Sequence, residues 1–146
     1  MTIERAKKSD LPDVLDLLGR QKLPLDGVGE TVGSMVVARH RGQVVGVAAA
    51  ELYADGALLR SVAVDSGRQG RGIGRQLTEA VLHMVAEHGL DAVFLLTTTA
   101  EHFFPRFGFE PVTRGDVPTS VQASIEFQSA CPASAVVMRK RYVRNG

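Results

Sequence analysis

The sequence predicts a mixed α/β domain in which antiparallel strands lead into a parallel strand pair. Two apolar runs, Met35–Arg39 and Gln43–Tyr53, flank a short polar turn and are typical of a β-hairpin. Asp55, followed by glycine, marks a second turn before a third apolar run, Ala57–Val64. A glycine loop and an amphipathic helix separate that run from a fourth, Asp91–Thr98. Because the fourth run is apolar throughout and is reached through a helix, we expect it to be buried and parallel to the third.

Helical spacing of apolar residues is found in two segments. The run Gly74–His88 places Leu77, Val81, Met84 and Val85 on one face. A shorter helix, capped by Ser9 or Asp10, places Leu11, Val14, Leu15 and Leu18 on one face.

The other predicted elements are shorter, and the segment between the first helix and the hairpin is irregular. In chain order they are a strand Thr2–Ala6, a helix Ala100–Phe107, a strand Phe109–Val112, a helix starting near Pro118 and a strand Val136–Tyr142. The segment 19–33 is rich in glycine and proline, and is either a plain connector or a lip over a binding site.

The bulk composition indicates one soluble domain spanning residues 1–146. The formal net charge of +1 argues against an extended nucleic-acid-binding face. No apolar run approaches the roughly 20 residues that span a bilayer, and the charged N-terminus lacks a signal peptide's apolar segment. Cys131 is the single cysteine, which fits a reducing compartment. The sequence therefore predicts a cytoplasmic protein with neither a nucleic-acid nor a membrane partner.

The glycine loop lies in the stretch DSGRQGRGIGRQL, between the third strand and the main helix. Its glycines, Gly70, Gly72 and Gly74, let backbone N–H groups approach a ligand without an intervening Cβ. The helix that follows adds unpaired N–H donors and the positive end of its dipole. This combination predicts an anion site, and phosphate is the usual anion.

Two common phosphate loops do not fit the spacing. The dinucleotide fingerprint is G-x-G-x-x-G with an acidic residue ending the second strand, whereas this loop reads G-x-G-x-G and its second strand ends in threonines. A Walker loop requires a lysine after its last glycine, and none lies near. Both schemes also begin with parallel strands, whereas this chain begins with hairpins.

The segment Gln69–Gly74 matches Q/R-x-x-G-x-G/A and resembles the pyrophosphate loop of the GNAT N-acetyltransferase superfamily, which binds acetyl-CoA. The hairpins before it and FFPRFGF (103–109) after the next strand are similar to the same superfamily, so the resemblance covers essentially the whole chain. It implies the GNAT acyl-CoA N-acyltransferase fold, with antiparallel N-terminal strands and a central parallel pair that splays apart. It also implies direct acetyl transfer from acetyl-CoA to an amine, without a metal. The four histidines show no metal-ligand spacing.

Two narrower resemblances concern the acceptor. LLTTTAEHFFPRFGFEPV and EFQSACPASAVVM look like the arsenic-resistance-associated N-acetyltransferases. LTTTA followed by an aromatic pair and GF resembles the acetyltransferase domain of N-acetylglutamate synthases. Both imply a small, amino-acid-like amine as acceptor. A protein or peptide N-acetyltransferase and a non-catalytic acyl-CoA-binding sensor are the alternatives, and a homodimer is possible.

Carried over residue by residue, the resemblance assigns the donor site to backbone groups of the third strand and the loop, together with a threonine and a phenylalanine that follow the fourth strand. One strand N–H, assigned to Val64, would polarise the thioester carbonyl, and arginines beside the loop would add charge. The assigned residues are Val62, Ala63, Val64, Gln69, Gly70, Arg71, Gly72, Ile73, Gly74, Arg75, Thr98 and Phe104.

The acid and base of the superfamily are not found at their usual positions. The tyrosine that often serves as acid is replaced by Phe104, which has no proton to donate. The usual glutamate before the loop falls at Arg60 or Ser61. The replacement candidates are Glu51, Glu101, His102 and Glu126, each otherwise a surface or capping charge.

Arg60 is unusual because it interrupts an apolar strand. An arginine buried without a partner would be costly. It therefore either pairs with an acidic neighbour such as Glu51 or binds an anionic group of the substrate, a carboxylate for example. Cys131, next to proline, is interpreted as packed rather than reactive.

Overall fold

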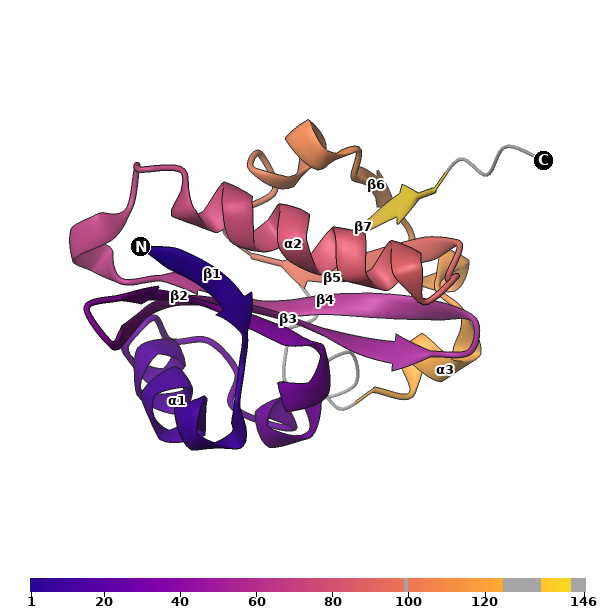
Figure 1. Ribbon diagram of the computed structural model, residues 1–146. Coiled ribbons are helices and arrows are strands. Elements are labelled where there is room, and N and C mark those ends of the chain that lie inside the picture. The colour runs from indigo at the N-terminus through magenta and orange to yellow at the C-terminus, as the bar shows by residue number, and fades with distance from the viewer. Residues whose placement is uncertain (99, 125–134, 143–146) are drawn as a thin grey trace.

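The computed structural model describes residues 1–98, 100–124 and 135–142, which form one seven-stranded sheet in the order β1-β2-β3-β4-β5-β7-β6 (Figure 1). Every neighbouring pair is antiparallel except β4 and β5, which are parallel. The strands are β1 (Thr2–Arg5), β2 (Met35–His40), β3 (Gln43–Tyr53), β4 (Gly56–Val64), β5 (Ala92–Thr97), β6 (Glu110–Val112) and β7 (Val136–Arg141). The predicted mixed sheet is therefore confirmed.

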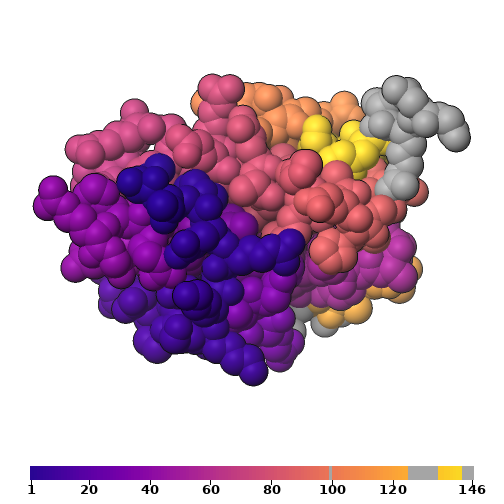
Figure 2. Space-filling model, in the orientation of Figure 1, coloured from indigo at the N-terminus to yellow at the C-terminus, as the bar shows by residue number. Residues whose placement is uncertain are grey.

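Helices cover both faces of this sheet. The long α2 lies on one face, while α1 and the 3₁₀ segment η2 lie on the other (Figure 1). In the space-filling view β1 crosses the front of the molecule, over one edge of the sheet (Figure 2). The α-helices are α1 (Leu11–Arg20), α2 (Ile73–Glu87) and α3 (Thr119–Gln122), and the 3₁₀ segments are η1 (Lys8–Asp10), η2 (Val28–Ser34), η3 (Ser66–Arg68), η4 (Phe104–Phe107) and η5 (Arg114–Asp116).

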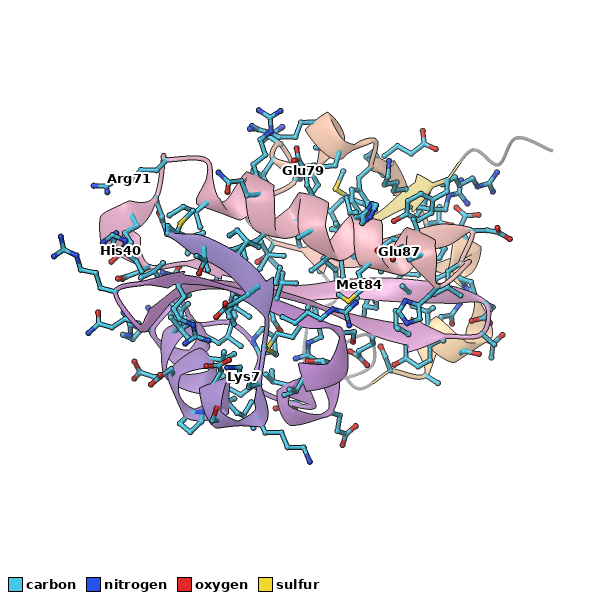
Figure 3. The ribbon with its side chains drawn as sticks, in the orientation of Figure 1. Lys7, His40, Arg71, Glu79, Met84 and Glu87 are labelled. Atoms are coloured by element: carbon cyan, nitrogen blue, oxygen red, sulfur yellow. The ribbon has the colours of Figure 1, made fainter. Side chains whose placement is uncertain are left out.

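The apolar face of α2 is buried as its spacing predicts. Leu77, Val81, Met84 and Val85 are buried in the main core against β3 and β4, while Glu79 and Glu87 are exposed (Figure 3). In α1 the buried residues are Val14, Leu17 and Leu18. Leu11 and Leu15 are only half-buried, so the predicted stripe is displaced by part of a turn.

The turn between β2 and β3 confirms the predicted hairpin. Arg41 and Gly42 have φ values of 52° and 79°, so both central residues are left-handed. That is the geometry of a type I′ turn, whose twist matches that of the flanking strands.

The segment 100–107 differs from the predicted helix. Only Phe104–Phe107 is helical, and it is a single 3₁₀ turn that Gly108 ends at a φ of 95°. Pro105 explains the difference, because a proline nitrogen cannot donate the backbone hydrogen bond that an α-helix from Ala100 would require. The predicted helix near Pro118 begins as expected at Thr119.

The parallel pair separates after a short contact. β4 and β5 pair only at Ala57 with Val93 and at Leu58 with Phe94, although the two strands run on to Val64 and Thr97. The expected splay is therefore present, and it opens next to the glycine loop.

The structure describes no helix that is both long and apolar enough to cross a membrane.

Candidate active site

A cleft of about 790 Å³ lies where β4 and β5 separate. Its floor is the second half of β4, and its walls are the glycine loop, the end of β5 and the aromatic segment before η4. The connector between α1 and η2 also contributes Gln21, Leu23 and Pro24. The first part of the segment 19–33 therefore forms a lip of the cleft, in line with one of the two interpretations, and its later residues line a different cavity.

The loop and the start of α2 form one end of the cleft. Gly70 and Gly72 are left-handed, with φ values of 82° and 79°, and a Cβ at either would meet no other atom within 4 Å. Gly72 is the N-cap of α2, so the first N–H groups of this 15-residue helix point toward the cleft end. Gly74 packs closely on β4, since a Cβ there would lie 3.5 Å from a Val64 methyl group.

Most of the predicted loop residues line the cleft, and one does not. Gln69, Gly70, Gly72, Ile73, Gly74 and Arg75 are in the lining, together with Arg68. Arg71 is exposed and extends outward from the tip of the loop (Figure 3). It can therefore add charge to the surface near the cleft but does not shape the cavity.

The orientation of the β4 backbone follows from one hydrogen bond. The N–H of Asp65 donates to the C=O of Val45 on β3 at 2.8 Å. Because successive residues of a strand direct their polar groups to opposite sides, Val64 and Val62 direct theirs toward the split, whereas Ala63 directs its own toward β3. Ala63 is therefore not placed to bind a cofactor through its backbone, although it lines the cleft.

Two glutamine side chains donate hydrogen bonds to the backbone carbonyl oxygen of Val64. Gln21 donates to it at 3.0 Å and Gln69 at 3.2 Å. A carbonyl oxygen has two lone pairs, so both are engaged, while the Val64 N–H faces the split on the same side of the strand.

Aromatic rings build the wall opposite β4. Phe103 lies edge-on to Phe104 and Phe107, with centroid distances of 5.1 and 5.2 Å. Phe104 is 6% exposed and lines the cleft, as predicted. Thr97 also lines it and accepts a hydrogen bond from the Ala100 N–H at 2.9 Å. Thr98 lies beyond the end of β5, exposed and outside the lining, so the geometry favours Thr97 over the predicted Thr98.

Arg60 is buried and paired. Its side chain is 1% exposed, and its Nη1 lies 3.1 Å from Oε2 of Glu51. Its Nε donates to Oγ of Ser61 at 3.1 Å and its Nη2 to the carbonyl of Pro24 at 3.4 Å. Of the two alternatives for Arg60, the structure contains the acidic pairing.

Glu51 is held from both sides. Besides Arg60, it accepts a hydrogen bond from the hydroxyl of Tyr53 at 2.6 Å. Burial, together with this bond to the carboxylate, raises the pKa of Tyr53 above its ordinary value, so the phenol stays protonated. Glu51 faces a second cavity of about 370 Å³ between η2 and β3, and is not in the lining of the main cleft.

The other acid–base candidates are more exposed. The His102 side chain is 97% exposed at the cleft mouth, with its Nε2 3.8 Å from Oε1 of Glu101. Glu101 is not in the lining of the cleft. Glu126 and Cys131 lie outside the described residues. Across residues 1–98, 100–124 and 135–142, no three His, Cys, Asp or Glu side chains gather as metal ligands.

Positive charge surrounds the loop end of the cleft. Partial desolvation, and then the charges of Arg68, the N-terminus, Arg41 and Arg71, hold the pKa of His40 below its ordinary value. His40 lies at the end of β2, on the same side of the molecule as Arg71 (Figure 3). This field is suited to a polyanionic ligand.

We expect the pKa of His40 to rise when CoA binds. Positive neighbours disfavour the imidazolium ion, and the phosphates of CoA would offset them, so protonation becomes easier. The measurement is an NMR pH titration of the histidine ring signals with and without saturating CoA. The ring signals of His83, exposed on α2 beside Glu87, are the internal control and should be the same with and without CoA. An unchanged or lower His40 pKa at saturating CoA would contradict the assignment of the phosphate end.

The split parallel pair, the left-handed glycine loop and the helix N-terminus together form the arrangement that the resemblance to the GNAT fold predicts. The family description "Acetyltransferase (GNAT) domain" matches residues 31–111, and the chain belongs to this family. It is 34% identical over 129 residues to an amino-acid acetyltransferase of Mycobacterium tuberculosis, covering 82% of this chain and 74% of that protein. It is 32% identical over 101 residues to an uncharacterised N-acetyltransferase, CT2212, of Chlorobaculum tepidum, covering 68% of this chain. That match spans 64% of the Chlorobaculum protein.

Solved structures agree with this assignment. Rv2747 from M. tuberculosis, in complex with CoA and NLQ, superimposes with a TM-score of 0.83 at 27% identity, covering 98% of this chain and 100% of that one. N-acetylglutamate synthase from Neisseria gonorrhoeae, with CoA and N-acetyl-glutamate, has the same TM-score at 20% identity. It covers 98% of this chain but 35% of the synthase, so it supports the fold alone.

Proposed function

We propose that this chain is a single-domain, acetyl-CoA-dependent N-acetyltransferase that acetylates the amine of a small, amino-acid-like acceptor. The observation that carries the proposal is the cleft between the split strands, with the glycine loop and the N-terminus of α2 at one end. The relatives named amino-acid acetyltransferase support the choice of acceptor class.

In this proposal the loop N–H groups bind the pyrophosphate, with Arg68 and Arg75 adding charge from the cleft wall. The pantetheine arm leaves the loop and runs back along β4, taking the place of a pairing strand. Its amide groups form hydrogen bonds with the backbone of Val64. The Val64 carbonyl must then lose a hydrogen bond from one of the two glutamine side chains and accept one from a pantetheine N–H.

The thioester lies at the far end of that arm, nearer to Ser61 than to the loop. We therefore assign the polarising N–H to Val62 rather than to Val64. Both face the split, and Val62 is the more distant from the loop. An N–H held in this way stabilises the oxyanion that forms as the amine attacks.

The acceptor would enter over the lip formed by Gln21, Leu23 and Pro24. Arg60 reaches the same region, but its guanidinium is 1% exposed, so an acceptor carboxylate would have to replace Pro24 or Glu51 as its partner. Glu51 is engaged by Arg60 and Tyr53, and Glu101 stands outside the cleft lining. An amine bound in its neutral fraction needs no dedicated base, at the cost of a slower reaction.

An acceptor screen tests this function. Thiol release from acetyl-CoA is measured with glutamate, its phosphinate and arsenical analogues, other amino acids, polyamines and peptides. We expect amino acids or their analogues to be the fastest acceptors and peptides to be slow. Turnover with peptides alone would mean that the acceptor is a peptide and not an amino acid. Fast turnover of the arsenical analogue alone would favour a function like that of the arsenic-resistance-associated N-acetyltransferases. CoA binding without thiol release on any amine would favour an acyl-CoA sensor, which the absence of a hydroxyl at Phe104 makes worth testing.

A further inference from the structure

The cleft contains a hydroxyl group that can replace the missing tyrosine. Phe104 contributes an aromatic ring without a hydroxyl group to the cleft wall. Among the described residues that line the cleft, Ser61 and Thr97 carry hydroxyl groups. Thr97 lies at the end of β5, where it accepts the Ala100 N–H, whereas Ser61 directly precedes Val62, the residue whose N–H we assign to the thioester. Ser61 lies in the part of β4 that has separated from β5.

We propose that the hydroxyl of Ser61 relays a proton from the attacking amine to the departing sulfur of CoA. This inference rests on the proposed N-acetyltransferase function and adds a catalytic residue to it.

The backbone at Ser61 is bent out of the regular strand. Ala49 pairs with Arg60 and Val47 with Ala63, so Ala48 alone stands opposite Ser61 and Val62. That is a β-bulge, and Ser61 takes a φ of 60° in it. A left-handed serine is uncommon and costs free energy, and strained residues of this kind gather at functional sites. Ser61 directly precedes Val62 in the bulge, and the Val62 N–H is the one that we assign to the thioester.

Arg60 fixes the hydroxyl on one side. Its Nε donates to Oγ of Ser61 at 3.1 Å, and Ser61 is 9% exposed. A hydroxyl has one proton and two lone pairs, so this bond leaves the proton and one lone pair for a ligand in the cleft. Arg60 is a positioning residue here, because it acts through the Ser61 hydroxyl that it orients. Its positive charge also stabilises the negative charge that develops on Oγ during the transfer.

The proton transfer balances without any further reactant. Attack of the neutral amine on the thioester carbon gives an adduct with a positive nitrogen and a negative oxygen. As the C–S bond breaks, sulfur takes the bonding electrons and receives the Ser61 proton, while Oγ receives a proton from the nitrogen. The products are the amide and the CoA thiol, and the serine is neutral before and after. A relay is more favourable for serine than acid catalysis alone. If serine only gave up its proton, it would become an alkoxide, which is too basic to form here.

Ser61→Ala is the direct test, because alanine keeps the Cβ and the left-handed backbone and removes only the hydroxyl. We expect kcat for acetyl transfer to the best acceptor to fall about 100-fold, within the usual range for acid–base help. The affinity for CoA should stay at the wild-type value, and the Tm should fall by only a few degrees, because the buried Nε of Arg60 loses its acceptor. Ser66→Ala, which removes an exposed hydroxyl from η3, is the matched control and should keep wild-type kcat. If Ser61→Ala does not fold, Ser61→Gly serves instead, since glycine suits a φ of 60°.

A proton inventory in mixtures of H₂O and D₂O separates a relay from a structural role. Two protons moving in one step give a curved plot for the wild type, and the variant without the hydroxyl should give a straight one. A kcat within about threefold of wild type, or a lower kcat with an unchanged curved plot, would overturn the relay. A wild-type protein that acetylates no amine would overturn the proposed function and the relay with it. An active wild-type protein whose Ser61→Ala variant keeps a near-wild-type kcat would overturn the relay alone.

Discussion

A glutamate in place of Gly72 should abolish CoA binding and leave the fold intact. A side chain at this position has open space, because a Cβ on Gly72 would meet no other atom within 4 Å. The fold therefore loses only the free energy of a left-handed non-glycine residue, roughly 1–2 kcal/mol. The new carboxylate stands at the N-terminus of α2, where the pyrophosphate is proposed to bind.

Charge repulsion sets the size of this effect. Two like charges about 4 Å apart at a protein surface repel by about 4 kcal/mol. We therefore expect the Kd for CoA, measured by calorimetry, to rise more than about 100-fold. Gly72→Ala separates the two contributions, since it carries the backbone strain without the charge and should weaken binding far less.

Gly89→Glu is the matched control for this variant. Gly89 has the same φ of 79° as Gly72 but follows the opposite end of α2. It should lose a similar amount of stability and bind CoA with wild-type affinity. Tight CoA binding by the Gly72→Glu protein, with its fold verified by circular dichroism, would refute the loop as the phosphate site.

The sequence carried enough information for the elements that depend on local signals. The hairpin was predictable because Arg41-Gly42 is compatible with a type I′ turn and apolar runs flank it. The buried face of α2 follows from its spacing, and the loop follows from alternating glycines before a helix. These signals are short in range, so no tertiary contact is needed to interpret them.

The features that were not predictable depend on pairing across the sheet. β7 lies between β5 and β6, an order that no local pattern encodes. The bulge at Ser61 arises from the register between β3 and β4, and serine has no sequence signal for a φ of 60°. The cleft is lined by Thr97 and not by the predicted Thr98, because β5 ends one residue earlier than the sequence predicts.

Hydrogen bonds that long side chains make to distant segments could not be predicted from the sequence either. Gln21 reaches the Val64 carbonyl across 43 positions of the chain, and Arg60 reaches Pro24 across 36. The Arg60–Glu51 pair was one of two open alternatives. An arginine buried in an apolar strand requires a partner, but the sequence does not determine which residue or ligand that partner is. The register decides it, since Arg60 stands opposite Ala49 and Glu51 lies two residues further on the same face of β3.

Replacing Arg60 by methionine should destabilise the protein by about 3 kcal/mol, because it leaves the partly buried Glu51 carboxylate without its cation. Glu51→Gln should also destabilise, since it removes the charge 3.1 Å from a guanidinium that is 1% exposed. The double variant should lose less than the sum of the two, by about 2 kcal/mol, because neither charge is then left behind. Urea denaturation of the four proteins measures this coupling. A loss below about 1 kcal/mol for Arg60→Met would mean that the pair contributes little to the fold.

The same four proteins also decide whether Arg60 contacts the acceptor. If the arginine serves only the pair, Arg60→Met and Glu51→Gln should change the KM for glutamate and for a neutral amine by similar factors. If it binds a carboxylate, Arg60→Met should raise the KM for glutamate selectively, by about 10-fold or more for a lost charge-assisted hydrogen bond. Glu51→Gln should then leave the KM for glutamate unchanged or lower it, because the guanidinium loses a competing carboxylate at 3.1 Å. An unchanged KM for every anionic acceptor in the Arg60→Met protein excludes the carboxylate-binding role.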